Sequence, residues 1–256
     1  PSSAASDVYK RQRQRLLESG VDALLAEHMA HLFVRDPLVI FSENTNLDDT
    51  RSMDHFENIQ STNWQTMRFK PPPHGGHTGW RVEFRSMEIQ LTDFENAAFC
   101  IFLVLLSRVI MTMPVDFGMP ISLVDVNMQR AQRRDAIHSQ RFHFRSSRHT
   151  SQTQEYTLAD IFHGSAGDDT MPGLLPLVHS YLDSLNMSET ERQRLNRYLD
   201  LVAMRVDGRL MSTATYIRQF VQQHPAYRRD SVVSDEINYD LLCTLCLLYT
   251  SPSPRD

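Results

Sequence analysis

Within residues 80–90 (WRVEFRSMEIQ), two arginines alternate with one carboxylate over residues 81–85. Successive side chains of an extended strand point to opposite faces, so Arg81, Glu83 and Arg85 share one face. Same-face side chains stand about 6.7 Å apart, close enough for the two arginines to bind neighbouring phosphate oxygens. Guanidinium groups bind phosphate bidentately, and a carboxylate oxygen suits Mg²⁺. The pattern indicates phosphoryl chemistry, although half-exposed antiparallel sheets also turn such charged faces to water.

A second strand is expected at residues 64–70 (WQTMRFK), because a loop rich in proline and glycine (PPPHGGHT) separates it from the first pattern. Together the two segments predict an antiparallel hairpin. Arg68 and Lys70 then share a face with Trp64. If the polar faces match, one wall carries four cationic groups around Glu83, and the opposite, apolar face is expected to pack against the core.

The surrounding elements are mostly helical, which predicts an α+β fold. Apolar spacing indicates a helix over residues 16–33, and residues 42–54 read as a polar loop. The apolar stretch 97–113 carries Arg108 and falls short of the roughly 20 residues that span a bilayer, so we expect a core helix and no membrane. Thr92 with Glu95 forms a capping box before it.

The second half of the sequence predicts helices in succession. Residues 125–140 fit an amphipathic helix, which runs into a polar loop with an arginine cluster that we expect to be solvated. Further helices are predicted over residues 174–185 and over residues 212–223. Between them, a capping box of Ser188 and Glu191 begins a long helix that Gly208 ends. We therefore assign residues 13–125 to the active-site sheet and core helices, and residues 126–245 to a helical C-terminal part.

Both ends of the chain look foreign to the fold. Residues 2–12 (SSAASDVYKRQ) and 246–256 (CLLYTSPSPRD) resemble in-frame translations of sequencing-library adaptors, so residues 1–12 and 246–256 are interpreted as non-native. Such segments should make no packed contacts; ordinary disordered tails are the alternative. Without a start methionine, and ending inside a helical pattern, the sequence reads as a fragment.

Composition excludes some classes of function. The net charge of −5 and pI near 6.1 give no basic footprint for nucleic acid. Cys100 and Cys243 show no CxxC spacing, and no signal peptide is evident, which favours the reducing cytoplasm. Cys100 lies in the apolar stretch and is expected to be a buried, inert thiol.

Two long runs closely resemble one enzyme family. Residues 55–73 (HFENIQSTNWQTMRFKPPP) and 79–95 (GWRVEFRSMEIQLTDFE) are similar to the catalytic subunits of eukaryotic glutamate-cysteine ligases. The resemblance extends in register over nearly all of residues 13–245. It covers the C-terminal portion of such subunits only.

The resemblance implies a glutamine-synthetase-like ligase that uses ATP and Mg²⁺ to join glutamate to cysteine, with a possible modifier subunit as partner. It implies that Glu83 is a Mg²⁺ ligand and that Arg85 contacts the transferring phosphoryl group. Trp64 resembles part of the amino-acid pocket, and Lys70, Arg35 and Arg81 are candidates for nucleotide phosphates. Each also has a plainer interpretation: Trp64 as a core aromatic side chain, and Arg35 as a partner for helix-end carbonyls.

This sequence departs from the family pattern in two respects. Ser86 stands where the family usually has proline, and the other metal-binding carboxylates of the family lie N-terminal to this segment. One carboxylate cannot hold a multi-Mg²⁺ site, so the segment alone is expected to be inactive. A non-catalytic paralogue or scaffold that keeps the hairpin as a binding surface is the alternative.

Overall fold

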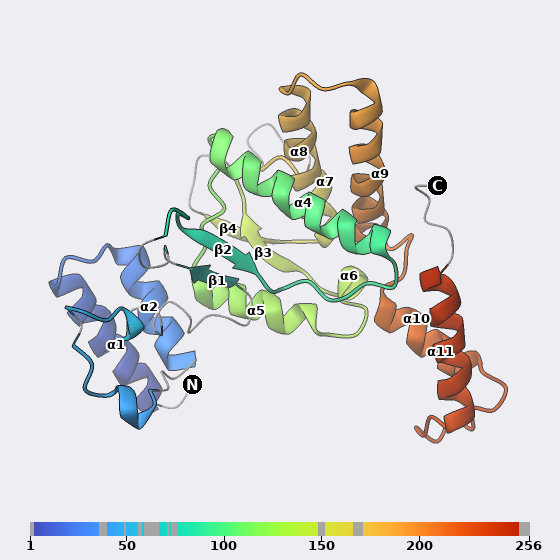
Figure 1. Ribbon diagram of the computed structural model, residues 1–256, viewed down its shortest axis with the longest axis horizontal. Coiled ribbons are helices and arrows are strands. Elements are labelled where there is room, and N and C mark those ends of the chain that lie inside the picture. The colour runs from blue at the N-terminus through green and yellow to red at the C-terminus, as the bar shows by residue number, and fades with distance from the viewer. Residues whose placement is uncertain are drawn as a thin grey trace. The chain divides into compact units, whose positions relative to one another are not determined.

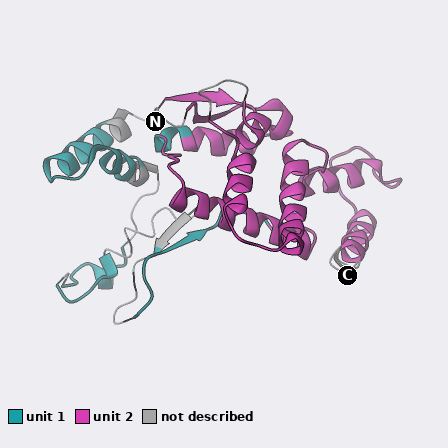
Figure 2. Ribbon diagram, turned by 90° about the horizontal axis from the view of Figure 1, so that it is seen from above, with its two compact units in different colours: residues 1–88, 120–123 teal, residues 89–119, 124–256 magenta. Residues whose placement is uncertain are grey.

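The computed structural model describes residues 3–35, 40–48, 50–55, 58, 67–70, 72, 76–147, 152–165 and 171–250. The chain forms two compact units, residues 1–88 with 120–123 and residues 89–119 with 124–256 (Figure 2). Helices dominate, and the described strands make two separate two-stranded antiparallel sheets (Figure 1). The division predicted between residues 125 and 126 stays a prediction.

The first unit begins with two helices, α1 (Ser3–Glu18) and α2 (Ala23–Arg35), where one helix was predicted over residues 16–33. Gly20 separates them with a φ of 83°, a left-handed conformation that ends a helix readily only at glycine. The Asp22 carboxylate then accepts from the amides of Leu24 and Leu25 at 3.0 Å and starts α2. A short 3₁₀ turn, η1 (Ser42–Asn44), lies within the predicted polar loop.

The N-terminal segment is helical and makes contacts. Residues 3–12 belong to α1, which packs on α2. The Tyr9 hydroxyl hydrogen-bonds Glu27, and partial burial together with that carboxylate raises the pKa of Tyr9. Val8 is 38% exposed and Tyr9 is only partly buried, so these residues do not show the extensive burial that would contradict an adaptor origin. The contact of Tyr9 with Glu27 nevertheless shows that the segment is not free of packed contacts. Its adaptor origin stays a prediction, and the corresponding test at the other end, burial of the Tyr249 side chain, lies outside the described residues.

The predicted hairpin is present. Strands β1 (Met67–Lys70) and β2 (Arg81–Phe84) pair antiparallel, with Arg68 opposite Glu83 and Lys70 opposite Arg81. Strand β2 is shorter than predicted, since it ends at Phe84, and residues 64–66 of the other predicted strand lie outside the described residues. The register confirms that the two polar faces coincide.

The core of the second unit lies between α4 (Asp93–Thr112), α7 (Leu158–His163), α8 (Leu174–Asp183) and α9 (Glu189–Val206), seen together in Figure 1. Phe102 stacks on Phe162 of α7 at a ring distance of 5.4 Å, and Phe94 stacks on Tyr198 of α9 at 4.8 Å.

Helix α4 has 20 residues, so the length argument against a membrane was wrong. It is long and apolar enough to cross a bilayer by composition, a test that core helices of soluble proteins also pass.

A second hairpin follows where a helix and a solvated loop were predicted. The helix over residues 125–140 is replaced by α5 (Ile121–Ala131) and the single turn α6 (Ala136–Ser139), separated at Asp135 with a φ of 53°. Strands β3 (Phe142–Arg145) and β4 (Thr153–Tyr156) then pair antiparallel.

The arginine cluster divides into exposed and paired members. Arg133, Arg134 and Arg141 are exposed, as predicted, whereas two others are held by carboxylates. Arg145 is buried and pairs with Asp116 at 2.9 Å, while Arg130 pairs with Glu155 at 2.8 Å. Arg145 stays buried because its guanidinium pairs with a carboxylate in the flanking loop, and Arg130 is partly buried beside the carboxylate of Glu155.

Helix ends in the second unit follow the predicted caps. Thr92 and Glu95 form a capping box on α4, and Ser188 and Glu191 form one on α9. Gly208 follows α9 with a φ of 70°. Helix α10 (Thr213–Gln223) is capped by Ser212 and ends at His224, and α11 (Asp235–Thr250) closes the described chain.

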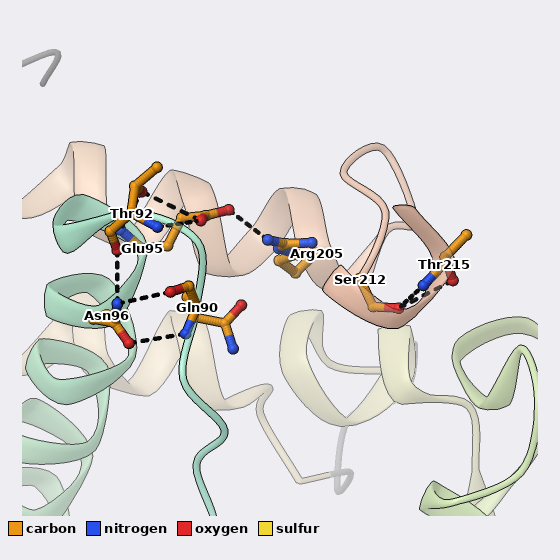
Figure 3. A network of polar contacts seen from close by, with 7 residues as sticks. All are labelled: Gln90, Thr92, Glu95, Asn96, Arg205, Ser212 and Thr215. Atoms are coloured by element: carbon orange, nitrogen blue, oxygen red, sulfur yellow. Dashed lines mark hydrogen bonds and ion pairs between the residues drawn. The ribbon is translucent and has the colours of Figure 1, made fainter. Parts of the chain in front are cut away.

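The α4 capping box also ties two helices together (Figure 3). Oε2 of Glu95 accepts from the Thr92 amide at 3.1 Å, while Oε1 accepts from Nη2 of Arg205, in the last turn of α9, at 2.5 Å. Asn96 locks the entry to α4 by accepting from the Gln90 amide at 3.0 Å. One carboxylate therefore caps α4 and anchors it to α9.

Candidate active site

The candidate site is the polar face of the β1–β2 hairpin. Glu83 lies between two cations: one carboxylate oxygen is in ion-pair contact with Nζ of Lys70, and the other is 2.9 Å from Nη2 of Arg85. The Glu83 side chain is 33% exposed, so substrate-sized groups can reach this cluster. The structure thus brings together three of the residues predicted for the site.

The strand register explains this cluster. Lys70 faces Arg81 directly, and like charges in opposing positions destabilise a sheet. Glu83 is the diagonal neighbour of Lys70, at a separation that a long side chain bridges. The carboxylate therefore compensates a face that is otherwise cationic. The backbone register places Arg68 opposite Glu83, at a position that the alternation predicted without assigning it a role.

Electrostatics keep Glu83 ionised. The hydrogen bond from Lys70 has the largest effect and lowers the pKa of Glu83. Burial, the next largest, opposes it, and the charges of Arg85 and Lys70 help to hold the pKa below its ordinary value. The site offers a charged oxygen ligand flanked by two donors to anions. Phosphate and a metal ion together need this combination of groups.

The other face of the hairpin differs from the prediction. Trp80 is 52% exposed, and Val82 and Phe84 are each 45% exposed. The expectation that this apolar face packs against the core is wrong for this chain. A two-stranded hairpin has no further strands to support it, and among the described residues no second layer covers the apolar side of β2.

Two predicted site residues cannot be placed on the wall. Trp64 lies outside the described residues, and the Arg35 side chain does so too, although its backbone forms the end of α2. Among the residues that the structure describes, no three His, Cys, Asp or Glu side chains gather as a metal site would require. Glu83 therefore fits one ligand of a Mg²⁺ site, and the described residues do not fit a complete one.

Cys100 was expected to be buried and inert. The structure places it on the exposed side of α4, because the apolar stretch is apolar on both sides and only one side faces the core. Cys243 is also exposed, on α11.

The hairpin wall brings Lys70, Arg81 and Arg85 to the same face as Glu83, and the chemistry of these groups suits phosphate and a divalent cation. Comparison with known proteins gives the family. The sequence profile of glutamate-cysteine ligase matches residues 4–247, and the chain belongs to that family.

Curated relatives support the same assignment. The chain is 49% identical to the glutamate-cysteine ligase catalytic subunit of Rattus norvegicus over 249 residues, 90% of this chain and 39% of the rat protein. It is 47% identical to the human catalytic subunit, again over 39% of that protein. The glutamate-cysteine ligase of Schizosaccharomyces pombe is 49% identical over 35% of its length. The chain thus spans about two fifths of the length of the relatives it matches.

Proposed function

We propose that the full-length protein joins the γ-carboxylate of L-glutamate to the amine of L-cysteine at the expense of ATP, the first step of glutathione biosynthesis. The family match over residues 4–247 carries this proposal. A γ-carboxylate oxygen attacks the terminal phosphorus of ATP, and ADP leaves. The cysteine amine then attacks the acyl carbon of γ-glutamyl phosphate, loses a proton and expels phosphate.

The hairpin supplies one wall of a glutamine-synthetase-like site. Arg85 contacts the transferring phosphoryl group, where its planar fork matches two oxygens. Lys70, Arg81 and Arg35 bind nucleotide phosphates. Trp64 forms part of the pocket for the amino-acid substrate. Glu83 is one ligand of Mg²⁺, an ion that neutralises charge on the phosphates when bound.

Charge balance supports this division of roles. Lys70 and Arg85 both pair with the carboxylate of Glu83. Phosphates bring negative charge for the two cations, which then release the carboxylate for a cation of its own. Phosphoryl transfer depends mostly on positioning and charge neutralisation, and this exchange provides both.

The test is steady-state ligase kinetics of the full-length protein across a Mg²⁺ titration. Glu83→Gln should raise the Mg²⁺ requirement and lower turnover, because a neutral oxygen attracts the ion less. Arg85→Lys should lower turnover on the order of a hundredfold with less effect on Mg²⁺, because the charge stays and the fork is lost.

The second hairpin offers matched controls. Glu155 of β4 is likewise an ion-paired glutamate with a pKa lowered by an arginine, Arg130. Glu155→Gln and Arg130→Lys should leave the Mg²⁺ requirement unchanged. Unchanged turnover in both Glu83→Gln and Arg85→Lys would show that the β1–β2 wall is only a binding surface or a solvated face.

A modifier subunit is a further proposed partner, since the rat relative is named a catalytic subunit. The 256-residue chain itself should show no ligase activity with ATP, Mg²⁺, glutamate and cysteine, because Glu83 is its single candidate metal carboxylate.

A further inference from the structure

Helix α4 has two apolar faces, and the structure covers only one of them. Its inner face is buried against α8 and α9 and consists of Ala98, Phe102, Leu105 and Val109. The opposite side exposes three side chains at helical spacing: Cys100, Val104 and Met111. Val104 is 58% exposed and Met111 75%. Steps of four and seven residues place them on one stripe, roughly 16 Å long.

The polar groups along this stripe do not call for water. Ser107 donates its hydroxyl to the Val104 carbonyl at 2.7 Å, and Thr112 donates to the Arg108 carbonyl at 2.7 Å. Both hydroxyls are thus satisfied by the backbone of their own helix. Apart from the exposed Arg108 at its edge, the surface that remains consists of methyl, methylene and sulfur groups.

Helix α9 shows what a solvent-facing helix of the same unit looks like. It buries Leu199 and Val202 in the same core as α4. Its outer side exposes Gln193, Arg194 and Asp200, the charged and polar face expected of a surface helix. A helix that is apolar on both sides instead belongs inside a larger protein or in a membrane.

Two observations favour the protein interior. The N-terminus of α4 is fixed to α9 by the partly buried Glu95 and Arg205 ion pair, and Arg108 adds an exposed charge near the C-terminal end of the helix. Moreover, the chain covers only 39% of the rat relative, so the larger part of such a subunit is available to cover this face.

We propose that the outer face of α4, made of Cys100, Val104 and Met111, is an internal interface of the full-length subunit. Its occupant is the N-terminal remainder of that subunit, which the resemblance in sequence places before this segment. Helix α4 is then a central helix with a core on each side. The inference rests on family membership and does not depend on ligase activity.

Cys100 reports on this interface without any substitution. In the full-length subunit, alkylation by N-ethylmaleimide should be at least about a hundredfold slower at Cys100 in the native protein than in urea, because a covered thiol is not accessible. The rate is read by mass spectrometry of the peptide that contains Cys100. Alkylation at a similar rate in both conditions would overturn the proposal.

A pair of variants tests the same face by stability. Val104→Glu should lower the thermal midpoint of the full-length subunit by roughly 5 °C or more, or abolish soluble expression, because it places a charge in an apolar interface. The milder Val104→Thr should lower the midpoint by a smaller amount. Gln193→Glu is the matched control, since it introduces the same carboxylate on the exposed side of α9. Equal midpoints for the three variants and the parent would overturn the proposal.

Other occupants give distinct results. Protection of Cys100 that appears only as dimers form in sedimentation velocity would assign the face to a second copy. Protection that requires added phosphatidylcholine vesicles would assign it to a membrane. Either result replaces the N-terminal remainder as the occupant, whereas protection in a dilute, vesicle-free monomer supports it.

Discussion

Replacing Glu95 by glutamine should loosen the joint between α4 and α9. The carboxylate caps α4 through Thr92 and accepts from Arg205 at 2.5 Å. Glutamine keeps an oxygen that can accept a hydrogen bond but loses the charge. Arg205 then stays where it is, a cation without its counter-ion.

The magnitude follows from burial. The side chains of Glu95 and Arg205 are only 16% and 11% exposed, so water compensates the uncovered charge poorly. Removing one partner of a buried pair costs about 3–5 kcal/mol, and the amide oxygen places Glu95→Gln near the lower end. About 3 kcal/mol raises the opening equilibrium of the joint on the order of a hundredfold.

Hydrogen exchange of the full-length subunit, read on peptides from the first turns of α4 and the last turn of α9, measures that opening. The Ser188 and Glu191 capping box is the control, because it repeats the motif of Thr92 and Glu95 on an exposed helix end. Glu191→Gln should change exchange of its own turn only slightly. Equal effects of Glu95→Gln and Glu191→Gln would refute the reasoning, since burial beside Arg205 is what separates the two sites.

Two further predictions concern a turn and a titration. Gly208→Ala should destabilise the fold by about 2 kcal/mol or more, since its φ is 70° and an added Cβ would lie 2.2 Å from Nε2 of His138. Adding His138→Ala to the Gly208→Ala variant should restore only the part of the lost stability that is due to the clash. Urea denaturation of the single and double variants measures that part. The pKa of Glu83 is lowered in the fold, so the stability that it contributes is present above its ordinary value of 4.5 and is lost as pH falls through the lower folded value. The protection of the β2 amides from hydrogen exchange should therefore fall in acid, and Glu83→Gln should remove this pH dependence. The same fall of protection in the variant as in the parent would contradict the prediction.

Helix ends in the second unit were predictable because their signals are local. The capping boxes at Thr92 and Ser188 need only a hydroxyl residue and an acid three positions later, and Gly208 needs only its own left-handed backbone. The β1–β2 pairing was predictable for a similar reason, since a short loop joins two alternating strands. The ion pairs of Glu83 followed from that register.

The second hairpin was missed because its local signal is ambiguous. Phe142 and Phe144 alternate as a strand should, yet three arginines nearby suggested a solvated loop. Burial of Arg145 depends on Asp116, 29 positions earlier in the chain, and such a partner cannot be read from a local window. The break at Gly20 was not predicted, because the apolar spacing of residues 16–33 indicates one helix and does not register a glycine within it.

Exposure of Trp80, Val82 and Phe84 also bears on how the site could work. A hairpin of two short strands is marginally stable alone, and catalytic groups must be held within about 0.5 Å of their working positions. The ion pairs of Glu83 are about one third exposed and cannot provide that rigidity, because exposed pairs exchange readily with water. The apolar side of β2 must therefore be covered before Glu83 and Arg85 are fixed in place. Inactivity of the isolated segment would then have two causes, missing metal ligands and an unsupported wall, and added Mg²⁺ could correct neither.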